Sequence, residues 1–166
     1  MTEDICSKLK KSVSSRHAKA QSVVAAVHSR FDLPRTRQTA RILKALDHPL
    51  VNVLAHPTGR LIEEREPYDV DMARIVRRAR ERGVLLEVNG QPSRLDLTDV
   101  HCRMAKDEGA LLTVNSDGHS TNDLDDLRFG IGQARRGWLE ARDVANTRPL
   151  KELRTLLGRR RKGTSP

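Results

Sequence analysis

The feature that most constrains the fold is a unit of one apolar run and one helical segment that occurs four times. The four runs lie at 23–27, 51–55, 84–88 and 110–114. Each continues into a segment whose apolar residues recur at helical spacing. Short apolar strands that alternate with amphipathic helices are typical of a parallel sheet covered by helices. The sequence therefore predicts an α/β protein, either an open doubly wound sheet or part of a closed barrel.

Capping residues and glycines mark the ends of the expected helices. Asp69 or Asp71 is placed to cap the helix after the second run, and Gly83 to end it. Thr98 and Gly109 have the same roles around the third helix. We expect each helix, and a last one near the C-terminus, to bury one apolar stripe. The expected stripes are Ile42, Leu43 and Leu46; Met72, Ile75, Val76 and Ala79; Leu97, Val100, Met104 and Ala105; Leu124, Leu127 and Ile131; and Leu150, Leu153, Leu156 and Leu157.

A length of 166 residues fits one ordinary domain. The net positive charge comes from the two ends of the chain. Residues 1–20 carry five Lys or Arg and two acidic residues, and residues 148–166 carry seven and one. These two ends account for the whole net charge of +9. We interpret 1–20 as a flexible basic lead-in, 21–157 as the domain and 158–166 as a disordered basic tail. The basic ends either attract a polyanion such as DNA or are simply solvated.

Several classes of protein do not fit this sequence. The apolar runs are too short to cross a bilayer, and the N-terminal residues contain no apolar signal segment, so we expect a cytoplasmic protein without a membrane partner. Cys6 and Cys102 lack CxxC spacing, which argues against a disulfide scaffold. Aromatic residues make up 2%, too few for a base-stacking platform. The sequence also contains no P-loop, GxSxG, HExxH or dinucleotide fingerprint.

Histidines follow three of the four apolar runs. His28 follows the first run, His56 the second and His119 the fourth, with Asp117 two residues before His119. Because the carboxyl ends of parallel strands meet at one rim, we expect these side chains to converge. A single histidine near a strand end is more often a structural hydrogen-bonding group than a metal ligand. Together, imidazole and carboxylate groups at equivalent positions predict a divalent metal site.

Three arginines follow the first, second and third runs and have a matching chemistry. Arg30, Arg60 and Arg94 are expected on the rim that carries the histidines. Guanidinium groups beside a metal would bind and polarise a phosphate ester. The alternative is that these arginines form surface salt bridges. The acidic residues available for such pairs are Glu63, Glu64, Glu66 and Asp96.

The segments at 27–32, 55–60, 65–71, 94–97, 115–120 and 134–139 carry a family resemblance. They resemble the PHP (polymerase and histidinol phosphatase) domain, and most closely the C-terminal PHP region of bacterial family X DNA polymerases. The resemblance extends from about residue 22 to about residue 157. It implies a partial (β/α) barrel of the PHP type, with about four βα units of parallel strands plus a C-terminal helix. It further implies a divalent metal, Mn or Zn, and a phosphoesterase of the DNA 3′→5′ exonuclease and phosphatase lineage.

Carried over by position, the resemblance makes His28, His56, Asp117 and His119 metal ligands. The nucleophile would be a metal-bound water. The family site also uses an HxH pair, and this chain contains none. We therefore expect a truncated domain with about half of its ligands, weak or inactive alone, whose open sheet edges associate with a complementary PHP half or a second copy. The alternative function is a non-enzymatic nucleic-acid-binding accessory that uses the basic tails.

Overall fold

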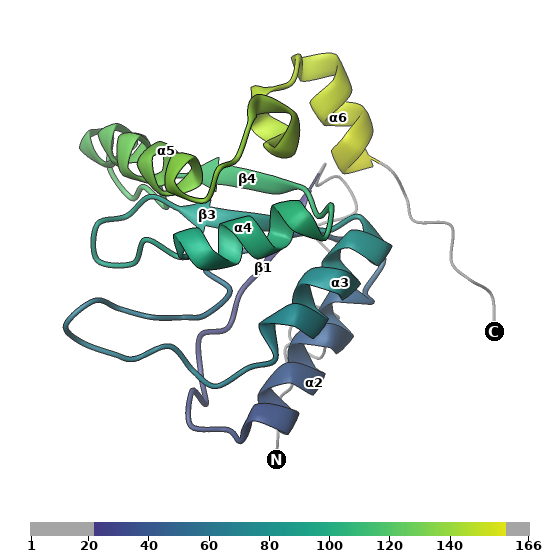
Figure 1. Cartoon of the computed structure of the whole chain (residues 1–166), viewed down its shortest axis with the longest axis vertical. Coiled ribbons are helices and arrows are strands. Elements are labelled where there is room, and N and C mark those ends of the chain that lie inside the picture. Colours follow the sequence, from purple (N-terminus) through teal and green to yellow (C-terminus); the bar gives the residue numbers. More distant parts are fainter. Residues whose placement is uncertain (1–21, 159–166) are drawn as a thin grey trace.

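In the computed structural model, which describes residues 22–158, parallel strands alternate with helices in the predicted order (Figure 1). The expected lead-in at 1–20 and the basic residues after 158 lie outside the described part. No helix within it has the length and apolar character needed to span a membrane. The elements are β1 (Val23–Ala25), α2 (Arg35–Leu46), β2 (Val51–Leu54), α3 (Met72–Arg82), β3 (Leu85–Asn89), α4 (Asp99–Asp107), β4 (Leu112–Asn115), the 3₁₀ turn η1 (Asn122–Asp126), α5 (Leu127–Arg136), the 3₁₀ turns η2 (Ala141–Asp143) and η3 (Ala145–Thr147), and α6 (Leu150–Gly158).

The four strands form one parallel sheet in the order β1-β2-β3-β4. Crossover connections between neighbouring parallel strands share one hand, so consecutive crossovers place their helices on the same face. Accordingly, α2 packs on α3, α3 on α4 and α4 on α5. A doubly wound sheet would instead reverse its strand order. The parallel βα architecture is confirmed, and within residues 22–158 the sheet is open.

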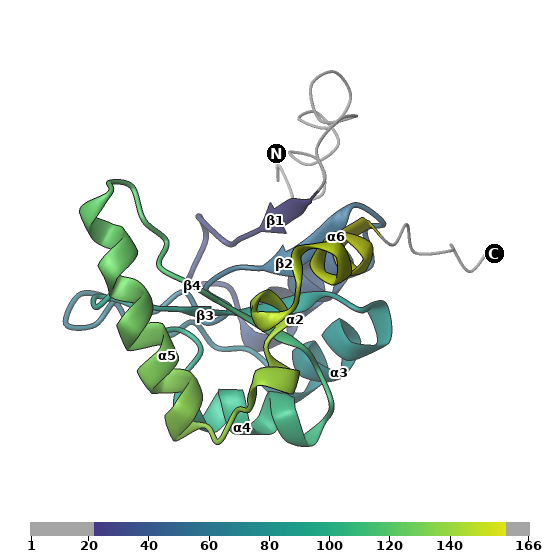
Figure 2. The same ribbon diagram turned by 90° about the horizontal axis from the view of Figure 1, so that it is seen from above.

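The two faces of the sheet contribute to different apolar clusters. Leu54 and Leu86 are neighbours in the β2–β3 register and lie in the larger cluster, which also includes residues of α2 to α5. Val53 and Leu85 are the adjacent register pair and, by strand alternation, point to the other face. There they contact Ala145 and three leucines of α6, Leu153, Leu156 and Leu157. Leu150, expected in the same buried stripe, is instead 61% exposed. Figure 2 shows α6 beside β2, away from α3 and α4.

Helix α5 packs through a different face from the predicted one. Leu124, Leu127 and Ile131 are 64%, 38% and 47% exposed, so the expectation that they form a buried stripe is wrong. The first of them lies in η1, before α5 begins. Gly130 and Ala134 are the buried residues of α5. A Cβ at position 130 would lie 2.8 Å from a methyl carbon of β4, so the close approach of this helix requires glycine.

The predicted helix ends at α3 and α4 are confirmed. Asp71 caps α3 by accepting a backbone N–H of its first turn at 3.0 Å, and Gly83 ends it with a φ of 62°. Thr98 caps α4 through its side chain. On α4, however, Val100 is 68% exposed, contrary to expectation, and Cys102 is the buried residue instead. Val100 and Cys102 lie on nearly opposite sides of the helix, and the buried side is the one that carries Cys102 and the expected Ala105.

The two edges of the sheet differ in how much of their backbone is already bonded. Val144 forms a parallel bridge with Leu112 of β4. The Asn146 side chain donates to the Val114 carbonyl at 2.7 Å and accepts the Val114 N–H at 3.1 Å, as a neighbouring strand would. At the opposite edge, no strand from residues 22–158 pairs with the outer side of β1. Val24 in β1 is 56% exposed. The expectation of two open edges therefore applies, within the described residues, only to β1.

Candidate metal centre

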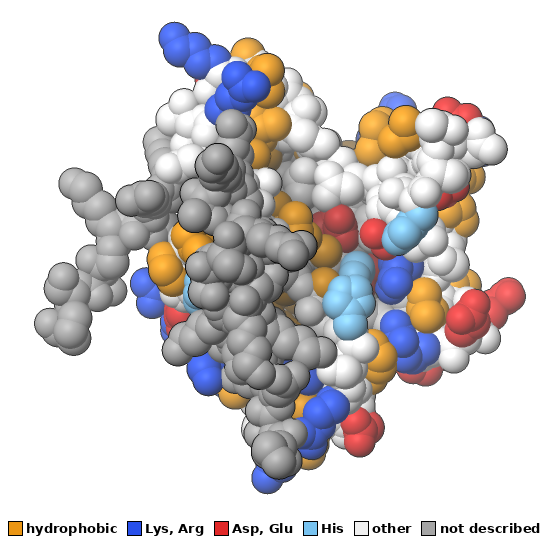
Figure 3. All heavy atoms as spheres, turned by 180° about the vertical axis from the view of Figure 1, so that it is seen from behind, with side chains coloured by type: hydrophobic (Ala, Val, Ile, Leu, Met, Phe, Trp, Pro, Cys, Tyr) orange, Lys and Arg blue, Asp and Glu red, His pale blue; other side chains and the backbone are white. Residues whose placement is uncertain are grey.

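The loops after β1 and β2 bring two histidine rings together. The ring centroids of His28 and His56 are 5.2 Å apart, with 77° between the ring planes. Two imidazoles on one tetrahedral zinc ion would have centroids about 5 Å apart, given metal–nitrogen bonds of about 2.0–2.1 Å. Figure 3 shows the face on which histidine side chains lie beside acidic and basic ones. The histidine pair therefore has the spacing of two ligands on one ion.

His56 is held in an unusual environment for a histidine. It is buried, and its φ of 30° lies in the left-handed region, which non-glycine residues rarely adopt outside functional sites. Its backbone N–H donates to Glu87 Oε2 at 2.8 Å, whereas its buried Nδ1 has no hydrogen-bond partner in the structure. Burial, reinforced by the positive charge of Arg94, lowers the His56 pKa to about 4. The ring is thus neutral at pH 7, the form that binds metal.

Asp117 supplies a carboxylate next to this ring. It also has a left-handed backbone, with a φ of 55°, and its side chain is 28% exposed. Its negative charge acts on the pKa of both His56 and Glu87. Asp117 Oδ2 lies 3.3 Å from Arg94 Nε. The carboxylate is therefore close to the histidine pair but is ion-paired with an arginine.

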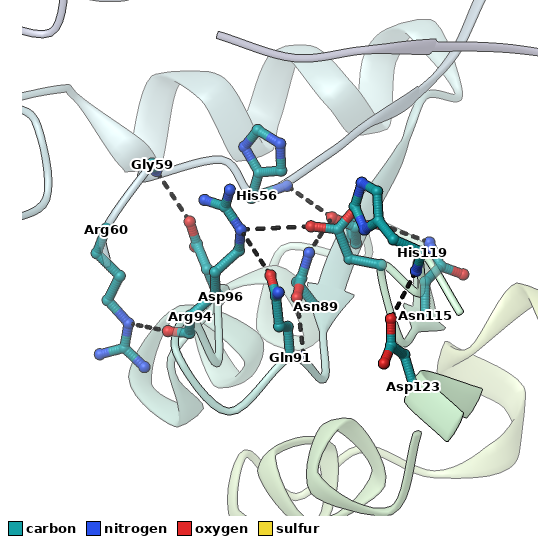
Figure 4. A network of polar contacts seen from close by, with 12 residues as sticks. His56, Gly59, Arg60, Asn89, Gln91, Arg94, Asp96, Asn115, His119 and Asp123 are labelled. Carbon is teal, nitrogen blue, oxygen red and sulfur yellow. Dashed lines mark hydrogen bonds and ion pairs between the residues drawn. The ribbon is translucent and has the colours of Figure 1, made fainter. Parts of the chain in front are cut away.

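His119 lies on the same loop as Asp117 but is exposed. Its backbone N–H donates to Asp123 Oδ2 at 2.7 Å. Figure 4 shows its ring on the same side of the polar network as His56 and Arg94. Among the residues that the structure describes, no group of three or more His, Cys, Asp or Glu is arranged to hold a metal ion. The predicted ligand role of His119 stays a prediction.

The donors brought together fit a divalent metal in their chemistry, although they do not make a complete set. Two imidazoles and one carboxylate are ligands that Zn and Mn accept. The unpartnered Nδ1 of His56 supports this fit, because a buried polar atom without a partner in the protein is costly. His28 and His56 therefore have the spacing of two ligands, Asp117 lies near enough to act on His56, and further donors would be needed to complete a metal site.

Glu87 is a functional-site residue that the sequence reasoning missed. It is 4% exposed and accepts the His56 N–H, Asn89 Nδ2 at 3.2 Å and Asn115 Nδ2 at 2.8 Å. Burial raises its pKa, while these hydrogen bonds act in the opposite direction. The signal was present in the sequence: a glutamate inside an apolar strand, with asparagine two residues later on the same face. Glu87 ties the His56 loop to β3 and β4.

Asp96 fixes the same loop from the other side. It is fully buried, and its Oδ2 accepts the backbone N–H groups of Thr58 and Gly59, each at 2.9 Å. The Arg60 guanidinium donates to two backbone carbonyls in the β3–α4 loop, which carries Asp96. These bonds clasp the β2–α3 and β3–α4 loops together (Figure 4). Asp96, named in the alternative as a partner for surface salt bridges, is instead a buried acceptor.

An aromatic stack supports the loops after β1 and β2. Phe31 stacks on Tyr68 with ring centroids 6.1 Å apart, and Arg65 lies 3.9 Å from the Phe31 ring centroid. The Tyr68 hydroxyl donates to the Pro57 carbonyl at 2.8 Å. Gly59, with a φ of 64°, lies against the Tyr68 ring, where a side chain would clash. The stack holds the residues beside the two histidines in place.

The three arginines expected at the rim have different surroundings. Arg94 is paired with Asp117 and lies close enough to His56 to affect its pKa. Two nitrogens of Arg60 are bonded to backbone carbonyls. Arg30 is exposed and has a φ of 53°. Their phosphate-binding role stays a prediction, and among the three Arg94 is the one placed at the histidine pair.

The Asp96→Asn variant is expected to change how the free energy of unfolding depends on pH, because it removes a buried carboxyl group. Burial raises the Asp96 pKa to about 6 from an ordinary 3.8, against the bonds from Thr58 and Gly59. Between these pH values the folded chain binds a proton that the unfolded chain does not. This proton binding stabilises the fold, and the stabilisation is fully present below pH 3.8 and is lost as the pH rises through 6. Denaturant unfolding from pH 7 to 4 should show wild type gaining up to about 3 kcal/mol relative to the variant.

An exposed aspartate provides the control for this experiment. Asp125→Asn should show no comparable change relative to wild type over the same pH range, because Asp125 is exposed. A pH-independent difference between wild type and Asp96→Asn would contradict the raised pKa.

Fold and site together define a class: an α/β protein whose parallel strands end at a rim of histidine, carboxylate and arginine side chains. No family model matches the chain. The sequence is 39% identical over 142 residues to the DNA polymerase/3′-5′ exonuclease PolX of Bacillus subtilis (strain 168), which covers 86% of this chain and 25% of that protein. It is 27% identical over 106 residues to a probable phosphatase of Clostridium novyi (strain NT), covering 58% of this chain and 41% of that protein.

These similarities identify two relatives of the chain. The chain is homologous to a bacterial DNA polymerase/3′-5′ exonuclease and to a probable phosphatase, in support of the predicted relation to PHP and family X proteins. The matches span about a quarter and about two fifths of the length of these two relatives.

Proposed function

We propose that the chain is the C-terminal part of a PHP domain of the family X polymerase type, in the lineage of metal-dependent phosphoesterases that act on DNA 3′ ends. The observation that carries this proposal is the His28–His56 ring pair at 5.2 Å, with the Nδ1 of His56 buried and unpartnered. Both relatives support it, one by name a 3′-5′ exonuclease and the other a probable phosphatase.

In this proposal His28, His56, Asp117 and His119 hold a divalent ion, Mn or Zn. Such an ion would polarise a phosphoester and lower the pKa of water near it. The side chains of the protein have three roles. The neutral His56 donates a lone pair to the ion, and Glu87 and Asp96 fix the loop that carries it. Arg30, Arg60 and Arg94 orient the phosphate. His56 is held on a rigid framework, which is what ligand placement requires.

We further propose that the isolated chain is weak or inactive until another chain supplies more ligands. This is supported by the donors of the described residues, which form no group of three or more suited to a metal. An ion held by two or three protein ligands and water binds more weakly than one in a full site. A complementary PHP half or a second copy of this chain would supply the remaining ligands.

Metal loading and hydrolysis test the proposed function directly. The purified chain is dialysed against Mn²⁺ or Zn²⁺, analysed for bound metal, and assayed on a 3′-recessed DNA and on a generic phosphoester. Bound metal that is lost in His56→Ala is the expected result, with weak hydrolysis or none. A wild-type chain free of metal after loading would overturn the proposal. Fast hydrolysis of either substrate would overturn its second part, the weak activity of the isolated chain.

No strand from residues 22–158 pairs with the outer edge of β1, and this leads to an expectation about association. An unpaired strand edge with an exposed apolar residue is a surface for strand pairing. We expect light scattering after size exclusion to show dimers or larger species at micromolar concentration. Val24→Lys on β1 should weaken this association, whereas Val100→Lys should not, although Val100 on α4 is comparably exposed. A stable monomer of the wild-type chain would contradict the expectation.

DNA binding through the basic ends is the alternative function, and its test is separate. Retention on DNA should fall steeply with salt and disappear when residues 159–166 are deleted. Retention that survives this deletion would remove the C-terminal basic segment from the proposal.

A further inference from the structure

Arg94 occupies a built position inside the candidate metal centre. Its side chain is 17% exposed, and its Nε lies 3.3 Å from Asp117 Oδ2 and 3.2 Å from Gln91 Oε1. Its backbone carbonyl accepts from Arg60, so the loop beneath it is fixed. Figure 4 shows the guanidinium beside His56, with a dashed line to the carboxylate of the neighbouring loop. The arginine therefore holds Asp117, the carboxylate whose charge acts on the His56 ring.

The hydrogen-bonding capacity of this guanidinium is not used up by these contacts. Arg94 Nη1 is buried and has no hydrogen-bond partner in the structure. A guanidinium presents five N–H donors in a planar fork that matches the oxygens of a phosphate. Because Nε makes the contacts with Asp117 and Gln91 while Nη1 has no partner, Arg94 has donor capacity left for a second anion. Arg60 differs, because two of its nitrogens are bonded to carbonyls.

The charge of Arg94 opposes a metal ion at the same place. Arg94 acts electrostatically on His56, as His28 does, so it lies within range of the site that the histidine pair would form. A divalent ion there would compete with Arg94 for Asp117 and repel its positive charge. A phosphate group that draws the guanidinium away would remove both effects.

We propose, building on the proposed function, that Arg94 exchanges partners: it holds Asp117 in the metal-free site and turns to a phosphate oxygen when a metal ion takes Asp117. Arg94 is thus a positioning residue that couples metal binding to phosphate binding. By linkage the coupling is reciprocal, so a phosphate ligand tightens metal binding and the metal tightens phosphate binding. The site would then acquire its ion most strongly when a phosphoester is present.

Calorimetric titration with Mn²⁺, with and without phenylphosphonate, tests this exchange. Phenylphosphonate resembles a phosphoester but has no ester bond to hydrolyse. Arg94→Gln should bind Mn²⁺ about 5-fold more tightly or better than wild type without phenylphosphonate. In that variant phenylphosphonate should no longer tighten Mn²⁺ binding. Arg103→Gln, which removes an exposed arginine paired with Asp107 on α4, should behave as wild type.

A second variant separates the charge of the Arg94 side chain from its planar shape. It also keeps the proposal testable if Arg94→Gln does not fold. Arg94→Lys keeps the charge without the planar fork, so it should keep the weak Mn²⁺ affinity and lose most of the coupling. Equal or weaker Mn²⁺ binding by Arg94→Gln, or unchanged coupling in either variant, would overturn the exchange while leaving the proposed metal site intact. If neither wild type nor Arg94→Gln binds Mn²⁺, the proposed function fails and the exchange with it.

Discussion

Replacement of Asp117 by asparagine is expected to lower Mn²⁺ affinity by about 100-fold or more and to remove any metal-dependent phosphoester hydrolysis. Loss of a residue that merely orients a metal ligand costs about 10–100-fold, and a direct ligand should cost at least as much. Asparagine keeps the size of the side chain but removes the negative charge that a divalent ion requires. Calorimetry with Mn²⁺ and hydrolysis of a 3′-recessed DNA measure the two effects.

Folding of the Asp117 variant should be little changed, which makes the loss interpretable. The side chain is 28% exposed, and asparagine keeps a carbonyl oxygen that can accept from Arg94. Asp107→Asn is the matched control, since Asp107 pairs with Arg103 on α4. If Asp117→Asn binds Mn²⁺ as wild type does while its circular dichroism is native, Asp117 is not a ligand.

Replacement of Glu87 by alanine is expected to lower the free energy of unfolding by about 3 kcal/mol or more. The carboxylate accepts three hydrogen bonds, from the His56 backbone and from the side chains of Asn89 and Asn115. Each buried donor left without a partner costs about 1–3 kcal/mol, and the cavity adds to this. Denaturant unfolding monitored by circular dichroism measures the loss.

Two further glutamate variants test the reason for this instability. Glu87→Gln keeps the shape but directs an amide donor at one of the three donors, so we expect an intermediate loss. Glu81→Ala removes an exposed glutamate paired with Arg78 and should change stability by less than about 1 kcal/mol. If Glu87→Ala unfolds like wild type, the buried network does not hold the His56 loop. The same variants should rank identically in Mn²⁺ affinity if the loop positions His56.

The relation between sequence and fold is clearest at the strands and helix ends. All four apolar runs became strands, with boundaries shifted by one or two residues, because buried parallel strands are recognisable as short continuous apolar segments. Asp71 and Thr98 cap their helices because capping depends on a side chain and its next few residues. Helix α5 buries a face adjoining the predicted one, because apolar spacing alone does not show what covers a helix and Gly130 allows its own face to approach β4.

Some residues of the candidate site are predictable from the sequence and others are not. The histidines and Asp117 were chosen from the sequence because residues after parallel strands must lie at one rim. Neither Glu87 nor Asp96 was chosen, since a carboxylate is normally exposed, and its burial depends on donors from other loops. The ion pair of Arg94 with Asp117 joins residues 23 positions apart and likewise depends on how two loops meet.

The alternation of strands and helices and the helix caps are predictable from the amino-acid sequence, because each depends on a local pattern. The rule that parallel strands end together likewise predicts which loops meet, while the ligand roles of their residues stay predictions. The buried faces of the helices, the contact of Asn146 with the edge of β4, and the bonds of Glu87, Asp96 and Arg94 at the rim are visible only in the folded chain. These are long-range contacts, and their energy comes from partners that no single segment of the chain contains.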